Sequence, residues 1–425
     1  MLVLSFVALG SLWKRPQLER RRAGHAFPAV LERVLRSRAL RIVVGGISAG
    51  LLTLVFLTAL IGEPTSSVNL APTFIYATFW VGLAFVQVLL GNVWRVLNPW
   101  LAIADAVAWI WRKLGQEWTP PLQYPERLGL WPGALFLFCF AAFELAYSEP
   151  ASPRALALAI AIYSYAMWFG MAAYGRREWD EHANGFTVYF GLLARIAPFG
   201  EHERRLVIRV PLSGLSGAEP TPGTIAFVAL MLGTVGFDGL TRAPFWQNLI
   251  ARVEGPYIVD APRTAELLAT GLALAGMIGC VLLVVVGYRV ATWIAERMVR
   301  SDRPLAPEFI LSLVPIAFVY AVAHYFTFLV IQGQYVWPLA SDPFGFGWDL
   351  FGSVDYGASL APFSTNTVRW TQFVALVAGH VAGLTVAHDR AVSIFPARDA
   401  LRSQYAMLAL MVVYTMTGLW LLSLG

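Results

Sequence analysis

Charged residues are scarce in this chain. Asp, Glu, Lys and Arg make up 13% of its 425 residues, whereas hydrophobic residues make up 58%. Soluble proteins average about 25% charged and about 45–50% apolar residues. A water-soluble fold of this length could not hide so much apolar surface while exposing so few charges. The composition therefore excludes an ordinary soluble domain and predicts a lipid bilayer as the main partner of the protein.

Cysteines and familiar catalytic motifs are also few. The two cysteines, Cys139 and Cys280, each lie inside an apolar run without Cys-x-x-Cys spacing. They indicate packing rather than a disulfide or a thiolate metal site. The net charge of +5 is too small to suggest a nucleic-acid partner. No P-loop, Rossmann fingerprint, His-Glu-x-x-His or serine elbow occurs, which argues against an ATP-driven motor.

Long hydrophobic runs, in contrast, recur along the whole chain. A membrane helix needs about 20 mostly apolar residues. The run 1–13 is too short, and we interpret it as the end of a truncated first span. With it, the sequence predicts an all-α polytopic transmembrane helix bundle of about ten spans, in one integral membrane domain over 1–425. The other spans lie near 42–62, 73–90, 133–147, 155–174, 224–240, 265–288, 308–332, 370–388 and 403–424.

The basic residues predict the orientation of these spans. Of the 31 Lys and Arg residues, 26 lie in segments 14–41, 91–132, 175–223, 289–307 and 389–403, and 5 lie in the alternate loops. Cytoplasmic loops retain basic residues. We therefore expect a multi-pass protein of the bacterial inner membrane with its C-terminus outside.

Two segments that are not spans are expected to lie along the inner interface. Asn98 and Pro99 form a helix start, with a side-chain cap and a proline in the first turn. The following residues, 100–113, carry three tryptophans and a basic end, as interfacial helices do. The apolar segment 186–199, interrupted by Arg195, is the second candidate.

Ionisable residues inside the predicted spans are the candidate functional residues, because such groups are costly in lipid. They are Glu144, Asp238, His324 and His380. The predicted topology places all four between the midplane and the outer surface. The two histidines belong to successive spans, so we expect comparable depths.

This set of residues is compatible with several kinds of chemistry. His324, His380 and Asp238 could bind a divalent metal such as Zn or Fe and activate a bound water, with Glu144 as a further ligand. The same groups could instead relay protons or bind a transported cation. Two histidines could also ligate a haem. Without any such role, a membrane histidine hydrogen-bonds to a neighbouring helix, at about 0.6 kcal/mol on average.

Three further features bear on the site. Gly379 and Gly383 flank His380 with the small-xxx-small spacing that lets helices approach closely, and Gly46 and Gly50 repeat it elsewhere. His388 precedes an Asp-Arg pair, and we interpret it as part of a solvated helix end at the inner interface. The outer loop 333–369 joins the two histidine-bearing spans and is either a lid or an aromatic belt at the interface.

Several segments together resemble a known family. They are GNVWRVLNPWLAIADAVAW at 91–109, YSYAMWFGMAAYG at 163–175, YFGLLARIAPF at 189–199, AHYFTFLVIQGQY at 323–335 and AGHVAGLTVAHDRAV at 378–392. The chain is similar, over nearly its whole length, to multi-pass membrane proteins of actinobacteria labelled fenitrothion hydrolase. The resemblance implies hydrolysis of organophosphorus esters, which are small apolar substrates, but it assigns no residue a role.

Three functions therefore stay open at the level of sequence. The first is a membrane-embedded, metal-assisted hydrolase of apolar esters, with His324 and His380 as ligands or general bases. The second is a transporter or channel in which the same residues line a polar pathway. The third is a haem- or quinone-binding redox subunit with partners in a larger membrane complex.

Overall fold

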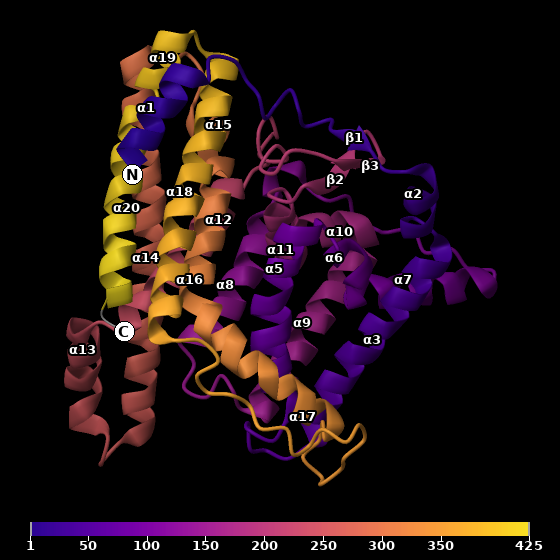
Figure 1. Cartoon of the computed structure of the whole chain (residues 1–425). Coiled ribbons are helices and arrows are strands. Elements are labelled where there is room, and N and C mark those ends of the chain that lie inside the picture. The colour runs from indigo at the N-terminus through magenta and orange to yellow at the C-terminus, as the bar shows by residue number, and fades with distance from the viewer. Residues whose placement is uncertain (1, 424–425) are drawn as a thin grey trace.

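The computed structural model describes residues 2–423, which form a bundle of helices with one small sheet (Figure 1). Within this range, seven helical segments are long and apolar enough to cross a membrane. The prediction of an all-α multi-pass bundle is confirmed at this level. The seven segments are α3 (Arg38–Ile61), α4 with η1 and α5 (Leu70–Leu90), α9 (Pro153–Tyr174), α12 (Thr224–Thr241), α14 (Pro262–Val299), the run from α15 to α17 (Ala306–Ser341) and α18 (Thr365–Ile394).

The prediction of about ten spans is not confirmed, because only these seven segments of residues 2–423 are long and apolar enough. The segment expected at 133–147 is α8 (Trp131–Leu145), whose 15 residues cover only about 22 Å, less than the hydrocarbon core of about 30 Å. The segments expected at 1–13 and 403–424 correspond to α1 (Leu2–Leu12) and α20 (Tyr405–Ser423). Met1, Leu424 and Gly425 lie outside the described residues.

The spans differ in how much of their surface is covered by protein. α12 is the most enclosed, with 61% of its apolar window buried, whereas only 17% of the α14 window is buried. α16 (Val314–Gln332), the main helix of the sixth segment, packs against both α12 and α18. α12 and α16 therefore form the interior of the bundle, and α14 presents most of its apolar surface outward, as a lipid-facing helix does.

α16 and α18 approach each other closely at the predicted small residues. A Cβ on Gly379 would lie 2.1 Å from a methyl carbon of Val319. A Cβ on Gly383 would lie 2.8 Å from the carbonyl oxygen of Ser312, in the turn η4 (Ile310–Leu313) that leads into α16. The prediction of a close helix contact at this pair is confirmed. Gly46 and Gly50 face open space, so the same spacing on α3 marks no contact among the described residues.

One of the two predicted interfacial helices differs from expectation. α7 (Pro99–Lys113) begins where predicted, and the Asn98 side chain accepts a hydrogen bond from the Leu101 amide. α11 (Gly185–Ala194), expected at the interface, is instead enclosed by protein, and eight of its ten residues are buried. It packs against α5 (Leu83–Leu90) and α8. An apolar segment of this length lies along an interface or inside a bundle, and its sequence alone does not separate the two.

The remaining elements lie at the two ends of the bundle (Figure 1). Strand β3 (Arg205–Ile208) pairs antiparallel with β1 (His25–Ala26) and β2 (Phe199–His202), which joins the N-terminal segment to the loop after α11. The short helices are α2 (Ala29–Leu35), α6 (Trp94–Leu97), η2 (Glu126–Leu128), α10 (Arg176–Ala183), α13 (Pro244–Glu254), η3 (Gly255–Tyr257) and α19 (Ala397–Arg402).

Candidate functional site

The clearest polar contact inside the bundle joins Asp238 on α12 to His324 on α16. The Nε2 atom of His324 lies 2.7 Å from Oδ2 of Asp238, and the two side chains are 7% and 17% exposed. The hydroxyl group of Tyr325 donates a hydrogen bond of 2.8 Å to the same carboxylate oxygen. We describe this pair as a close electrostatic contact. Two of the four predicted residues therefore meet directly.

Glu144 on α8 belongs to the same group of residues. Its carboxyl group interacts electrostatically with Asp238 and with the hydroxyl groups of Tyr189 and Tyr325. Glu144 has no ion-pair partner among residues 2–423. The interior of the bundle therefore holds two carboxyl groups that interact electrostatically, and one of them, Asp238, contacts an imidazole. We call Glu144, Asp238, His324 and Tyr325 the acid–histidine cluster.

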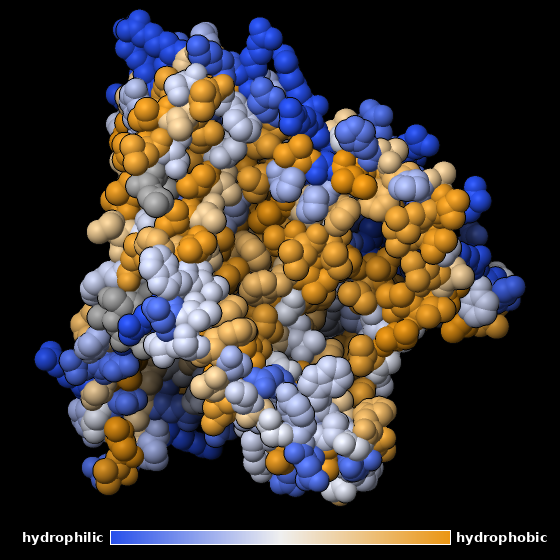
Figure 2. All heavy atoms as spheres, viewed as in Figure 1, coloured by the Kyte–Doolittle hydropathy of each residue, from blue (hydrophilic) through white to orange (hydrophobic). Residues whose placement is uncertain are grey.

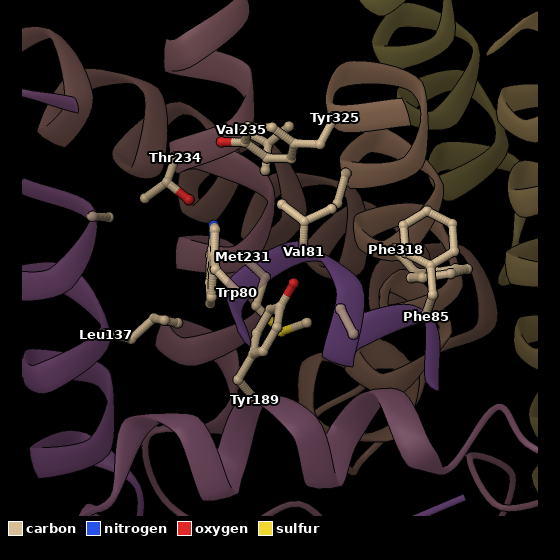
Figure 3. A pocket seen from close by; sticks show the side chains of 13 residues that line it. Trp80, Val81, Phe85, Leu137, Tyr189, Met231, Thr234, Val235, Phe318 and Tyr325 are labelled. Atoms are coloured by element: carbon tan, nitrogen blue, oxygen red, sulfur yellow. The ribbon is translucent and has the colours of Figure 1, made fainter. Parts of the chain in front are cut away.

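A small cavity lies next to this cluster (Figure 3). Its volume is about 20 Å³, and its lining includes Trp80, Tyr189, Thr234 and Tyr325. A cavity needs roughly 10–15 Å³ to hold one water molecule, and the water needs polar partners. The hydroxyl groups on the wall provide such partners, so the cavity can hold a single water within the bundle.

The second membrane segment shapes this cavity through an unusual helix. Residues Phe74–Gly82 form the π-helix η1, between α4 (Leu70–Thr73) and α5. Its Trp80 stacks on Tyr189 of α11, with 4.6 Å between ring centroids and 27° between planes. π-Helical turns are rare and frequently occur at functional sites.

The sequence did not single out Trp80, Tyr189, Thr234 or Tyr325. Their only sequence signal is the presence of hydrogen-bonding side chains inside predicted apolar segments. The arrangement of α11 was the main obstacle, because Tyr189 reaches the cluster only if its helix is inside the bundle.

His380 does not join the acid–histidine cluster. It is fully buried on α18, its Nδ1 atom lies 2.8 Å from the Leu376 carbonyl oxygen, and its ring contacts Tyr320 edge-on at 5.8 Å. Its Nε2 atom has no hydrogen-bond partner within residues 2–423. Among residues 2–423, no group of three or more His, Cys, Asp and Glu side chains could hold a metal ion. The expected ligand set of His324, His380 and Asp238 is therefore not assembled.

A second polar network lies at the other end of α18 and corrects the expectation for His388. This residue is 2% exposed, not solvated, with Nε2 at 2.9 Å from the Trp13 carbonyl oxygen and Nδ1 at 3.0 Å from the Gln404 side chain. The neighbouring Asp389 carboxylate accepts five hydrogen bonds. The donors are the indole of Trp13, the amides of Gln17, Leu18 and Glu19, and the hydroxyl of Ser216. This network fastens the N-terminal segment to α18.

A third buried carboxylate, Asp180, lies on α10 outside the spans. Its Oδ1 atom accepts hydrogen bonds from Asn98, Asn184 and Thr187, at 2.7, 2.8 and 3.0 Å. Burial raises the pKa of Asp180 above its ordinary value, and these hydrogen bonds lower the pKa only in part. The network orients α7, α10 and α11 relative to one another.

A large apolar groove borders α8 at residues other than Leu137 and Ala141, which line the small cavity. Its volume is about 980 Å³, and its α8 wall is made by Phe136, Cys139, Phe140 and Phe143. The ring of Phe140 lies 4.8 Å from that of Trp80, which lines the small cavity. One layer of aromatic side chains therefore separates the groove from the cavity.

The fold and these sites define the chain as having the architecture of a multi-pass α-helical membrane protein, by the length and composition of its helices. Comparison with protein-family models, with curated proteins and with solved structures gives no match.

Proposed function

We propose that the protein transfers protons through the acid–histidine cluster and couples this transfer to the movement of a solute or ion across the bacterial inner membrane. The observation that carries the proposal is the contact between Asp238 and His324, with Glu144 close by, inside the membrane bundle. Ionisable groups at such depth are expensive and typically belong to proton or ion pathways.

The charges of the cluster give this proposal a physical basis. His324 and Arg242 both interact electrostatically with the Asp238 carboxyl group, whereas Glu144 has no ion-pair partner among residues 2–423. A carboxylate without a partner is costly in a medium of low dielectric constant. The cluster therefore favours taking up one further proton or a small cation. Tyr325 donates a hydrogen bond to Asp238 and also lines the one-water cavity, so a water molecule in the cavity lies next to the cluster.

The experiment measures proton flux in liposomes that contain the purified protein and a pH-sensitive dye, under an imposed membrane potential. We expect proton uptake with the wild type and its loss in Asp238→Asn and His324→Gln. Asp355→Asn in a loop and His202→Gln in strand β2, which replace the same residue types outside the membrane-spanning helices, serve as controls. Equal flux in the wild type, the cluster variants and protein-free liposomes would refute the proposal.

A second candidate, ester hydrolysis, is favoured by the apolar groove beside the cavity. Its volume of about 980 Å³ is at the upper end of the typical range for ligand pockets, about 300–1,000 Å³. A carboxylate beside an imidazole is the arrangement of a general base, here next to space for one water. Together with the resemblance to fenitrothion hydrolases, this supports an attack by water on an apolar phosphotriester that enters from lipid.

The hydrolase candidate has its own test. Release of nitrophenol from a nitrophenyl phosphotriester by the purified protein, lost in His324→Gln but kept in His202→Gln, would support it. Proton flux without ester hydrolysis would refute the hydrolase candidate and support the transport proposal.

A further inference from the structure

The apolar groove opens onto the part of the surface that the membrane-spanning helices present. Its walls come from α3, η1, α8 and α9. Three lining residues, Leu51, Leu158 and Ile162, are 39%, 62% and 61% exposed. Figure 2 shows the surface around α3 and α9 as mainly hydrophobic, with a hollow in it. In a bilayer, the molecules that meet this opening are lipids.

Polar side chains lie at one end of the groove, so its two ends differ in polarity. Arg154 is the only charged residue of the lining, and it is exposed in the first turn of α9. It makes no ion pair or hydrogen bond with another residue of the range 2–423. Tyr147 and Ser152, which also line the groove, lie in the same connection between α8 and α9.

These features match the two parts of a phospholipid. The aromatic and aliphatic walls suit an acyl chain, because they pack against it by van der Waals contact and leave no polar group unpaired beside it. A phosphate group would meet the free guanidinium group of Arg154 at the amino-terminal end of α9, where the helix dipole also favours an anion.

We propose that the groove binds one phospholipid of the adjacent leaflet, with an acyl chain between α3, η1 and α9 and the phosphate at Arg154. The inference requires only that the bundle lies in a membrane. It is independent of proton transfer, because it uses none of the residues of the acid–histidine cluster, and it gives the groove a different occupant from the ester of the hydrolase candidate.

Native mass spectrometry of the delipidated protein tests this proposal with two lipids. One is a phosphatidylglycerol, and the other is a diacylglycerol with the same acyl chains but no phosphate. We expect a one-to-one complex with phosphatidylglycerol and weaker binding of diacylglycerol. In Arg154→Gln, phosphatidylglycerol affinity should fall about ten- to hundredfold, as expected for the loss of a charged hydrogen bond. Its diacylglycerol affinity should stay unchanged.

A second variant tests the acyl-chain part of the site. Ala159→Phe places a ring in the groove and should weaken binding of both lipids, and Ala159→Leu serves if the larger substitution prevents folding. The matched controls are Arg252→Gln on α13 and Ala172→Phe on an exposed position of α9, which should bind as the wild type does. Phosphatidylglycerol binding that is unchanged in Arg154→Gln and in the Ala159 variants would overturn the proposal.

Discussion

The imidazole of His324 and the carboxylate of Asp238 face each other at 2.7 Å across the contact between α16 and α12. Both side chains are mostly shielded from solvent, so bulk water does little to stabilise a charge on either of them. The contact between His324 and Asp238 therefore affects both the stability of the bundle and the chemistry of the cluster.

Removal of either partner should destabilise the protein, and the two substitutions should not be additive. Asp238→Asn and His324→Gln each leave the other group without its charged partner, whereas the double variant leaves no unpaired charge. We expect a coupling energy of about 0.5–3 kcal/mol. Unfolding in detergent measures it, and the distant pair Asp355→Asn with His202→Gln provides the control. Additive effects at Asp238 and His324 would show that the contact does not stabilise the fold.

The close approach of α16 and α18 predicts opposite effects for two glycine substitutions. In Gly383→Ala, the new methyl group meets the carbonyl oxygen of Ser312 at 2.8 Å, and backbone cannot move aside as a side chain can. We expect a loss of stability of about 1–3 kcal/mol, as for overpacking in other cores. In Gly50→Ala, the methyl group enters open space, and the higher helix propensity of alanine should leave stability unchanged or slightly raised.

Thermal unfolding in detergent compares these two variants directly. An equal effect of both substitutions would mean that helix propensity, rather than the contact at Gly383, decides the outcome.

The sequence predicted the class of fold because hydrophobic runs of membrane length have few alternative structures. It also pointed to Asp238 and His324, since ionisable residues in such runs are rare. It failed where burial depends on tertiary packing. α11 was expected at the interface, yet it brings Tyr189 beside the cavity. His388 was expected in solvent, yet the N-terminal segment covers it.

The metal-ligand hypothesis failed for the same reason, because it also depended on tertiary packing. His324 and His380 lie on successive spans, but depth along a helix does not determine the direction in which a side chain points. His324 faces Asp238 on α12, whereas the ring of His380 packs against Tyr320. Helix rotation depends on packing against neighbours such as Val319 at Gly379, and a single sequence does not contain that information.

Asp180 should make stability depend on pH. Its folded-state pKa is raised by burial, so its contribution to stability is fully present below its unfolded pKa and is lost as pH rises through the folded value. Asp180→Asn keeps an acceptor oxygen for the network without a charge. We expect the variant to lose less stability than the wild type as pH rises from acidic toward neutral.

Unfolding midpoints across this pH range measure the effect. Asp260→Asn, at an exposed carboxylate, is the matched control and should follow the wild-type profile. If the unfolding midpoint of Asp180→Asn depends on pH as that of the wild type does, groups other than Asp180 cause the dependence.

The five donors around Asp389 predict a local, rather than a global, effect of its substitution. Three of these donors are consecutive amides, Gln17, Leu18 and Glu19, which a carboxylate can satisfy together. Asp389→Asn removes the charge and replaces one acceptor oxygen with a donor group that faces other donors. Leaving buried amides without acceptors costs about 1–3 kcal/mol each, so the N-terminal segment should detach while α18 stays folded.

Limited trypsin digestion should then cut at Arg20–Arg22 much faster than in the wild type. Asp399→Asn, on α19, should leave that rate unchanged. Equal cleavage rates in Asp389→Asn and the wild type would mean that the strand pair β1–β3, rather than Asp389, fixes the segment.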